Sequence, residues 1–368
     1  MPATALDTIE LFRLRLPLLR PFVISLGPIL SVQNLVVRLR TAGGLIGYGE
    51  CSPYPTINGE TLDTCWSVGH LLADALRGRD ALDIAGCHAA MGRLIYANHS
   101  VKSAFDMALH DVAAQHAGLP LFRWLGGAER PNRPLRTGMT VSLGPAEQMR
   151  AEAVRFQQAG FAVIKVKLGE GLAADVGRVR AIRAGIGPAH PLRVDANQGW
   201  DTPAVALAVL RALAPLNIEF CEEPLARHRF LDLPALSAAS PIPIMADESC
   251  CDAHDAARLI GLRACPLLNI KLGKSAGLHQ ARQVVALGAA AGLGLQVGGF
   301  MESRLGMSAA AHLALSHDAV RYCDFDTPYM FAQDPVRGGL DYGPGGALCL
   351  PDEVPGIGAV IGEEYLEG

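Results

Sequence analysis

The second part of the chain alternates between short apolar segments and Ala-rich segments, and this alternation restricts the fold more than any other feature. The apolar segments recur roughly every 25–30 residues, a spacing typical of β-strands joined by helices. Eight strands are predicted, near Leu135–Leu143, Ala162–Leu168, Leu192–Asn197, Ile218–Glu223, Ile242–Asp247, Leu267–Leu272, Leu293–Gly298 and Val320–Asp326. Helices are predicted between them, including Pro145–Ala159, Ala204–Ala214 and Ala276–Ala291. This alternation favours a parallel sheet, and eight units favour a TIM-like barrel. A doubly wound sheet is the alternative, but no GxGxxG motif opens a helix.

The residues before about 131 follow a different pattern. Strand-like segments come first, and helical periodicity then extends from Thr61 to about Gly118. The strand-like segments are Thr8–Leu16 and Asn34–Glu50. We therefore expect an N-terminal α+β domain over residues 1–130 and a barrel domain over 131–334. The Gly- and Pro-rich tail, about 335–368, is expected to complete the first domain.

Composition argues against several classes of protein. The net charge is −4 and no basic run occurs, so a nucleic-acid partner is not expected. The nine cysteines are odd in number and lack CxxC spacing, which indicates reduced thiols in a cytoplasmic protein. Charges interrupt the apolar N-terminal stretch, and no segment approaches the ~18 apolar residues of a membrane span. We expect no signal peptide and no membrane partner.

One predicted strand, Phe161–Gly169, carries two lysines within its apolar run, Lys165 and Lys167. Because side chains in a strand alternate between its faces, both lysines point to the same face. Burying two ammonium groups side by side is costly unless anionic groups lie next to them. The pair therefore indicates a functional site at the strand end, where barrels hold their active sites.

Each of the next three predicted strands ends in a carboxylate, and the three side chains would converge at one end of a barrel. These residues are Asp195, Glu222 and Asp247. One of them alone would be interpreted as a helix cap, but three on successive strands require a cation between them. Oxygen ligands favour a hard ion, so we predict one Mg²⁺ per subunit. The residues expected to support these ligands are Asn197, Glu223 and Glu248.

Lys271 lies on the sixth predicted strand, four strands from Lys167 and so on the opposite side of a barrel. Two bases that face each other suit removal of a proton from one side of a carbon and its return from the other. The proton would lie next to a carboxylate, since Mg²⁺ neutralises the enediolate that results. Lys165 and the metal would lower the pKa of Lys167, as nearby cations do. The alternative for Lys271 is an ion pair with a barrel carboxylate.

The eighth predicted strand ends in Asp324 and Asp326, which would share a face by the same alternation. Two inward carboxylates away from the metal would suit an ammonium group on the substrate. The alternative is that they belong to a solvated strand end or turn.

Together these residues resemble the enolase superfamily, and within it the muconate-lactonising subgroup. The resemblance rests on the Lys165-Val166-Lys167 motif, the three carboxylates and Lys271, and it extends over essentially the whole chain. It implies a (β/α)7β barrel, one helix short of eight full units, with an N-terminal capping domain. It also implies that Thr140 and Gly299 line the substrate site. The seventh predicted strand offers no histidine, which argues against the His–Asp racemases of the superfamily.

Within this subgroup, the Asp324–Asp326 pair resembles the mark of dipeptide epimerases, in which it binds the α-ammonium group of the substrate. The implied reaction inverts the C-terminal residue of an L-Ala-Xaa-type dipeptide, with Lys167 serving one face and Lys271 the other. Members that act on Ala-Glu carry an arginine in the first loop, where this sequence has Gly27. We therefore hypothesise a preference for hydrophobic Xaa. The residues expected to set this specificity are Phe22, Ile24, Gly27, Tyr54 and Ile57.

Other functions remain open at this point. The closest alternatives are o-succinylbenzoate synthase, muconate cycloisomerase and N-acyl amino acid racemase, whose substrates lack an ammonium group and would be repelled by Asp324 and Asp326. A metal-dependent hydrolase would need histidine ligands at strand ends, whereas the histidines here fall mostly on predicted helices. A non-catalytic metal-binding protein would leave the facing lysines unexplained. We expect a small-molecule dipeptide as substrate and a homo-oligomer as the assembly.

Overall fold

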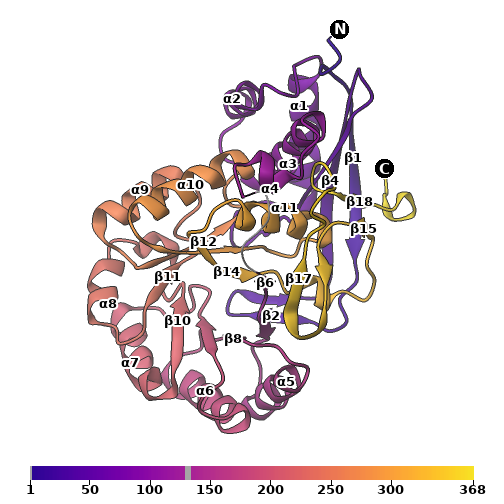
Figure 1. Cartoon of the computed structure of the whole chain (residues 1–368). Helices are drawn as coiled ribbons and strands as arrows, with labels where there is room; N and C mark the ends of the chain where they lie inside the picture. Colours follow the sequence, from indigo (N-terminus) through magenta and orange to yellow (C-terminus); the bar gives the residue numbers. More distant parts are fainter. Residues whose placement is uncertain (1, 129–133) are drawn as a thin grey trace.

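The computed structural model describes residues 2–128 and 134–368. The domain boundary expected between residues 130 and 131 lies outside these residues and stays a prediction. In Figure 1 an N-terminal sheet with its helices lies above a larger body in which strands and helices alternate. No helix in the described ranges has both the length and the apolar character needed to cross a membrane.

The N-terminal part is an antiparallel sheet covered by helices. Its strands pair in the order β1 (Leu6–Leu16), β4 (Val32–Thr41) and β5 (Ile46–Cys51), while β2 (Phe22–Ile24) and β3 (Gly27–Ile29) form a separate hairpin. The helices are α1 (Leu62–Leu76), α2 (Ile84–Leu94), α3 (His99–His116) and α4 (Leu121–Trp124). Helix α3 packs directly on the β5 backbone, since a Cβ on Gly49 would lie 1.9 Å from the carbonyl oxygen of Ala104. Glycine at this position therefore permits the close approach.

Eight parallel strands form the larger sheet, and each pairs with the next strand along the chain. They are β7 (Met139–Val141), β8 (Ile164–Lys167), β9 (Leu192–Asp195), β10 (Ile218–Glu222), β11 (Ile244–Ala246), β12 (Leu267–Lys271), β13 (Gly294–Gly298) and β14 (Val320–Asp324). Each lies within one of the segments predicted from the sequence. Their pairing in chain order is that of a TIM-like barrel and excludes the doubly wound alternative, whose strand order reverses.

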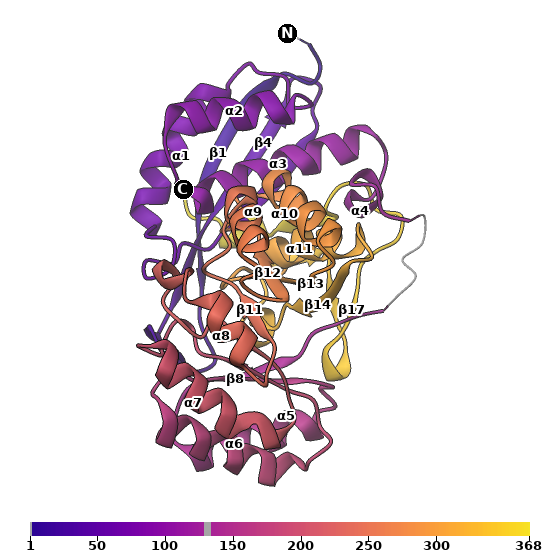
Figure 2. The same cartoon turned by 90° about the vertical axis from the view of Figure 1, so that its left-hand side faces the viewer.

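Seven helices connect these eight strands within the described residues and lie outside them (Figures 1 and 2). They are α5 (Ala146–Gln158), α6 (Leu172–Ile186), α7 (Pro203–Leu213), α8 (Leu233–Ala239), α9 (Ala253–Leu262), α10 (Leu278–Ala290) and α11 (Arg304–Leu315). The expected (β/α)7β barrel with an N-terminal α+β cap is therefore confirmed, and the initial count of eight full units is one helix too high. After β14 the chain forms a short 3-10 helix, η3 (Thr327–Met330), and then enters the tail.

The first and last strands of the barrel, β7 and β14, are joined by side chains at the seam between them. The backbone N–H of Thr140 donates a hydrogen bond of 2.7 Å to Asp326 Oδ2. The backbone N–H of Phe325 donates one of 2.9 Å to Thr137 Oγ1. These bonds couple the end of the barrel to its beginning at the rim where the charged residues lie.

The C-terminal tail returns to the N-terminal part. It contains β15 (Val336–Gly338), β16 (Asp341–Tyr342), β17 (Ala347–Cys349) and β18 (Ala359–Ile361); β15 pairs with β18, and β17 pairs with β16 and with β6 (Leu135–Arg136). The backbone N–H of Arg13 donates to Glu367 O at 2.7 Å, and that of Leu121 donates to Gly356 O at 2.8 Å. These contacts attach the tail to β1 and α4.

A buried carboxylate joins the cap to the barrel. Glu50, at the end of β5, accepts hydrogen bonds from the backbone N–H groups of Ser303 (2.9 Å) and Gly306 (3.0 Å) at the start of α11. Asn34 donates to the same carboxylate at 2.7 Å and to Met301 O at 2.8 Å. An anion at a helix N-terminus is favoured by the unpaired N–H groups and the helix dipole. This contact fixes the cap above the barrel end that holds the site.

Candidate active site

The carboxyl ends of the barrel strands gather six charged side chains. Strand β8 contributes two lysines and β12 a third, while β9, β10 and the residue directly after β11 contribute the carboxylates. In chain order these residues are Lys165, Lys167, Asp195, Glu222, Asp247 and Lys271, all buried. Acidic and basic groups therefore compensate one another in a region from which water is largely excluded.

Lys165 lies at the centre of this cluster. Its Nζ is 3.0 Å from Asp195 Oδ2, 2.8 Å from Glu222 Oε2 and 2.9 Å from Asp324 Oδ2. Burial opposes the charge on this ammonium, but the three carboxylates, Asp324 first among them, outweigh burial and raise the pKa of Lys165 well above its usual range. Lys165 therefore stays protonated and binds anions in this arrangement.

The other two lysines each contact one carboxylate. Lys167 Nζ donates to Asp195 Oδ2 at 2.7 Å, and Lys271 Nζ donates to Asp247 Oδ2 at 2.6 Å. Strands β8 and β12 are four apart in the sheet order, so the two lysines enter the site from opposite sides. Burial disfavours the charge on Asp195, but Lys167 and Lys165 outweigh burial and lower the pKa of Asp195 to about 2.

Glu222 is the carboxylate whose charge is least compensated. Burial first, and the charge of Asp195 second, raise the pKa of Glu222 to about 7. Two uncharged side chains also contact it: Asn269 Nδ2 donates to Oε1 at 2.9 Å, and Gln296 Nε2 donates to Oε2 at 3.4 Å. Sequence reasoning missed both amides, although Asn269 precedes Lys271 by two residues on β12 and so shares its face.

The residues expected to support the ligands lie directly behind them. Glu223 Oε2 accepts from the backbone N–H groups of Asp247 (2.6 Å) and Ser249 (3.2 Å), and Ser249 Oγ also donates to Glu223. Asn197 Nδ2 donates to Glu248 Oε1 at 3.2 Å. Glu223 and Asn197 have φ values of +34° and +41°, a left-handed conformation that costs energy in residues other than glycine. Such strain is typical of functional sites.

A fourth lysine, to which sequence reasoning assigned no role, supports Asp247. Lys274 has a fully buried side chain, and its Nζ lies 2.6 Å from Asp247 Oδ1 and 2.9 Å from Asn269 O. It also donates to the backbone carbonyl of Asp247. Burial disfavours charge on Lys274, but Asp247 outweighs burial and raises its pKa. Asp247 is thus held between two ammonium groups, those of Lys274 and Lys271.

The chemistry of these donors fits a hard divalent cation. Asp195, Glu222 and Asp247 are fully buried, and two of them, Asp195 and Asp247, raise the pKa of Glu222 through their charge. A further buried oxygen, Glu248 Oε2, has no hydrogen-bond partner within residues 2–128 and 134–368. In the same residues, no three His, Cys, Asp or Glu side chains are already arranged as metal ligands. Ammonium groups lie among the carboxylates in this arrangement.

The two aspartates after the eighth strand lie at the barrel seam, but not as strand alternation predicted. Strand β14 ends at Asp324, and Asp326 has helical backbone angles at the start of η3, so the expected shared strand face is wrong. Asp324 reaches Lys165, whereas Asp326 accepts from the backbone N–H of Thr140. Burial first, and the charge of Asp324 second, raise the pKa of Asp326 to about 6. The pair still concentrates negative charge beside Lys165.

The chain is similar to known proteins over nearly its whole length. An enolase C-terminal domain-like family model matches residues 148–365, and the mandelate racemase/muconate lactonizing enzyme N-terminal domain matches residues 8–126. The D-Ala-D/L-Ala epimerase of Cytophaga hutchinsonii is 48% identical over 98% of this chain and 97% of its own length. The L-Ala-D/L-Glu epimerase of Bacillus subtilis is 36% identical over 98% of both chains. A dipeptide epimerase structure from C. hutchinsonii, complexed with Mg and D-Ala-L-Val, superposes with a TM-score of 0.97 at 47% identity, covering 99% of this chain and 98% of that one.

The chain belongs to the dipeptide epimerases of the enolase superfamily. It is an isomerase, and the resemblance inferred from its sequence motifs is confirmed.

Two segments of the cap contact the barrel loops beside the epimerase site. One of them is the β2–β3 hairpin, in which Phe22–Ile24 pairs with Gly27–Ile29. Val23 N–H donates to Ser142 Oγ at 2.7 Å, and Ser25 Oγ donates to Asn197 O at 2.7 Å. The hairpin is therefore bound to the barrel loops after β7 and β9.

Aromatic rings lie over both facing lysines of the epimerase. The Phe22 ring centroid, in the hairpin, is 5.9 Å from Lys167 Nζ. The Phe300 centroid, after β13, is 5.0 Å from Lys271 Nζ, and the Tyr54 ring lies 5.6 Å from Phe300. Rings at these distances stabilise a neighbouring cation and exclude water from it.

The remaining residues predicted to line the substrate site differ in exposure. Ile24 and Ile57 are buried, and the Ile57 carbonyl accepts from Arg227, so these two help to fix the cap segments. Gly27 has φ +122° and no atom within 4 Å of the place that a Cβ would take, whereas a Cβ on Gly299 would lie 2.3 Å from Met307 Cε. A side chain thus has room at Gly27 but not at Gly299.

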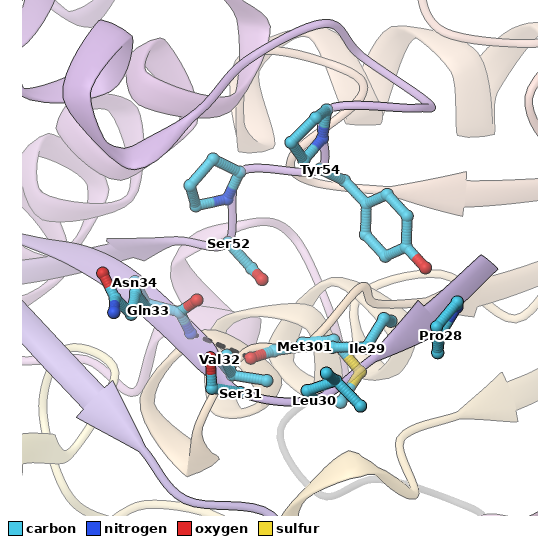
Figure 3. Close-up of a pocket in the computed structure, with 12 residues that line it drawn as sticks. Pro28, Ile29, Leu30, Ser31, Val32, Gln33, Asn34, Ser52, Tyr54 and Met301 are labelled. Atoms are coloured by element: carbon cyan, nitrogen blue, oxygen red, sulfur yellow. Dashed lines mark hydrogen bonds between the residues drawn. The ribbon is translucent and has the colours of Figure 1, made fainter. Parts of the chain in front are cut away.

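A cavity of about 310 Å³ lies between the hairpin and the segment that contains Tyr54 (Figure 3). Figure 3 shows the Tyr54 ring reaching across it toward Pro28 and Ile29, with Met301 below. Its lining residues are Pro28, Ile29, Leu30, Ser31, Val32, Gln33, Asn34, Ser52, Pro53, Tyr54, Pro55 and Met301. None of these lining residues carries a charge.

Proposed function

We propose that this enzyme is an Mg²⁺-dependent epimerase that inverts the α-carbon of the C-terminal residue of L-Ala-Xaa-type dipeptides with hydrophobic Xaa. The reaction is a two-base 1,1-proton transfer through an enediolate. The observation that carries the proposal is the placement of Lys167 and Lys271 on opposite sides of one carboxylate cluster. A single base could exchange the α-proton but could not return it to the other face.

Asp195, Glu222 and Asp247 would hold the cation, and their lysine partners would release these oxygens on binding. When bound, Mg²⁺ supplies positive charge next to the substrate carboxylate, where negative charge builds up as the α-proton leaves. Glu223 accepts from the Asp247 backbone and the Asn197 backbone N–H donates to Asp195 Oδ1, so both help to position ligands, and Asn197 in turn donates to Glu248. This support orients the ligands before substrate binds.

The chain's own residues then move the proton. In the unprotonated form, Lys167 removes the α-proton from one face of the carbon, and the Lys271 ammonium donates a proton to the other face. For the opposite stereoisomer the two roles exchange. Phe22 and Phe300 cover these lysines and limit proton exchange with water. Lys165 remains charged and binds the substrate carboxylate.

The substrate's α-ammonium group binds at the seam of the barrel, next to Asp324 and Asp326. Asp326 is buried and Asp324 is half-buried, and burial and the charge of Asp324 raise the pKa of Asp326, so a cation between them is favoured. Thr140 orients Asp326 through its backbone N–H. N-succinylated substrates lack the ammonium group and would bring a carboxylate to this place.

Two observations support an uncharged Xaa. The cavity between the hairpin and Tyr54 has no charged residue in its lining. Position 27, where Ala-Glu enzymes of the family carry an arginine, is a glycine. An acidic Xaa would therefore be desolvated without a cation to pair with it.

Deuterium exchange over a dipeptide library tests the function directly. Pooled L,L-dipeptides are incubated with the enzyme in D₂O with Mg²⁺, and mass spectrometry identifies those that gain one deuteron at the C-terminal α-carbon. Chiral chromatography then confirms inversion, with an EDTA-treated sample and N-succinyl amino acids as controls. We expect exchange into Ala-Xaa with Xaa such as Val or Leu. Exchange only into N-succinyl amino acids, or preference for Ala-Glu, would overturn the proposal.

A further inference from the structure

A second cavity, of about 550 Å³, lies at the seam of the barrel and has no role in the function proposed above. It is bounded by β7, α5, η3 and the chain that leads into the hairpin. Its lining residues are Leu19, Arg20, Pro21, Phe22, Met139, Thr140, Ser142, Glu152, Arg155, Phe156, Ala159, Phe161, Tyr329 and Met330. It occupies the side of the barrel where the eighth helix of a full set would pack.

The cavity shares two wall residues with the active site. Thr140 lines the cavity, and its backbone N–H is 2.7 Å from Asp326 Oδ2, one of the carboxylates assigned to the ammonium group. Phe22 lines the cavity too, and its ring centroid is 5.9 Å from Lys167 Nζ. The cavity therefore begins at the ammonium end of the site, away from the uncharged cavity beside Tyr54.

The covalent structure of a dipeptide determines which of its side chains can reach the seam cavity. The N-terminal residue carries its ammonium group and its side chain on the same carbon, so the nitrogen and Cβ are only about 2.5 Å apart. If the ammonium group lies against Asp326, the side chain starts next to Thr140 and Phe22. We propose that this seam cavity binds the side chain of the N-terminal residue of the dipeptide; the proposal rests on the function proposed above.

The lining of the seam cavity selects the chemical class of that side chain. Its inner wall is aromatic, with rings packed edge to face: the ring centroids of Phe156 and Phe161 lie 6.0 Å apart, and those of Phe161 and Tyr329 lie 5.3 Å apart. Met139 and Met330 add flexible apolar surface. The site therefore accepts Leu-, Met- or Phe-sized apolar side chains, and the substrate class extends beyond N-terminal alanine.

Three of the residues that line the seam cavity are charged, Arg20, Glu152 and Arg155, and they pair with one another. Glu152 Oε1 lies 3.0 Å from Arg155 and 3.7 Å from Arg20, whose side chain is 67% exposed. The carboxylate is thus shared between two guanidinium groups at the solvent side. An acidic N-terminal side chain would have to cross the aromatic wall before it met a cation, which disfavours it.

A substrate series with the wild-type enzyme and Mg²⁺ tests the proposal. The C-terminal residue is fixed as L-Val and the N-terminal residue is L-Ala, L-Leu, L-Phe or L-Glu, with kcat/KM taken from α-deuterium exchange in D₂O. We expect Leu-Val and Phe-Val to react within about tenfold of Ala-Val or faster, and Glu-Val at least about tenfold slower. A rate for Leu-Val and Phe-Val that is about a hundredfold or more below that for Ala-Val would overturn it.

A variant that fills the seam cavity adds a second readout. Ala159→Phe places a ring at the end of α5, and we expect the Phe-Val to Ala-Val ratio of kcat/KM to fall about tenfold or more. Ala151→Phe is the matched control, since Ala151 is exposed on the same helix and outside the lining; its ratio should equal that of the wild type. An unchanged ratio in Ala159→Phe would contradict the proposal. Failure of every dipeptide, Ala-Val included, would instead refute the proposed function.

Discussion

Lys167 and Asp195 are register partners on neighbouring strands β8 and β9, and Lys167 Nζ lies 2.7 Å from Asp195 Oδ2. A proposed base is thereby coupled directly to a proposed metal ligand. Lys271 and Asp247 repeat this pairing at 2.6 Å on the other side of the barrel. Each lysine is thus positioned by a carboxylate that would also bind the cation. Cation binding and the positioning of the bases therefore depend on the same two carboxylates, Asp195 and Asp247.

Lys167→Ala and Lys271→Ala are expected to lose epimerisation by about 10²–10⁴-fold, the usual contribution of a general base or acid. Each variant keeps one lysine, so each should still exchange the α-proton of one stereoisomer with solvent. The measurement is chiral chromatography combined with deuterium exchange on the L,L and L,D substrates. Lys102→Ala, in helix α3 of the cap, is the control for loss of a lysine. Normal epimerisation in both site variants would refute the two-base mechanism.

Lys274→Met is expected to destabilise the protein by about 3–5 kcal/mol, because it leaves the buried charge of Asp247 undercompensated. The Lys274 ammonium has no exposure and contacts Asp247 Oδ1 at 2.6 Å. Urea unfolding measures the free energy of unfolding of the variant. Arg77→Ala is the control. It removes an exposed ion pair, in which Arg77 lies 3.5 Å from Asp74, and should lower the free energy of unfolding by less than about 1 kcal/mol. Equal losses in the two variants would show that Lys274 does not neutralise a buried charge.

Mg²⁺ is expected to raise the melting temperature of the wild-type protein without any substrate. At a hundred times its Kd, a ligand that binds only the folded state stabilises it by about 2.7 kcal/mol. Glu222→Gln keeps the shape of the side chain but removes one of the three carboxylates, so its response to Mg²⁺ should be much smaller. Differential scanning fluorimetry with MgCl₂, and with EDTA as reference, measures both. If the two proteins respond alike, Glu222 is not a ligand.

His312 is expected to make the protein less stable as the pH falls. It is buried on α11, where its Nδ1 accepts from Phe122 N–H at 3.0 Å and its Nε2 lies 3.1 Å from Ile357 O. Burial lowers the pKa of His312 to about 4, so the folded protein keeps it neutral while the unfolded chain takes up a proton near its ordinary pKa of 6.5. Stability is therefore lost as the pH falls from 6.5 to about 4, by up to about 1.4 kcal/mol per pH unit.

The measurement for His312 is the difference in unfolding free energy between the wild type and His312→Gln. The wild type should lose stability relative to His312→Gln as the pH falls from 6.5 to 4. The difference should stay constant between pH 7 and 8, where His312 is neutral in both the folded and the unfolded chain. A constant difference over the whole range would show that His312 titrates alike in the folded and unfolded chains.

Much of the site followed from the sequence because two simple periodicities determine it. Alternation along β8 places Lys165 and Lys167 on one face, and the alternation of strands and helices brings Asp195, Glu222 and Asp247 to one end of the barrel. These relations depend only on chain order, so no knowledge of packing is needed.

The parts that escaped prediction depend on contacts between distant segments. Asp326 was expected on a strand, but the strand ends at Asp324 and a bond from Thr140 fixes the carboxylate. The hairpin β2–β3 has only three residues per strand, too few for a periodic signal, and Ser142 of the barrel secures it. Lys274 follows the end of β12, so the alternation of side chains along the strand could not predict its contact with Asp247.

Gly27→Arg is expected to shift the enzyme toward acidic dipeptides. Gly27 opposes Ile24 across the hairpin, and nothing lies within 4 Å of the position of a Cβ there, so the side chain has room to extend toward an Xaa carboxylate. The φ of +122° is strained for any residue with a Cβ, so the variant should also lose about 1–3 kcal/mol of stability. Gly27→Met carries the same strain and a long uncharged side chain, and is the matched control. We expect the Ala-Glu to Ala-Val ratio of kcat/KM to rise about tenfold or more in Gly27→Arg alone. A similar rise in Gly27→Met, or none in either, would mean that charge at position 27 does not set the specificity for Xaa.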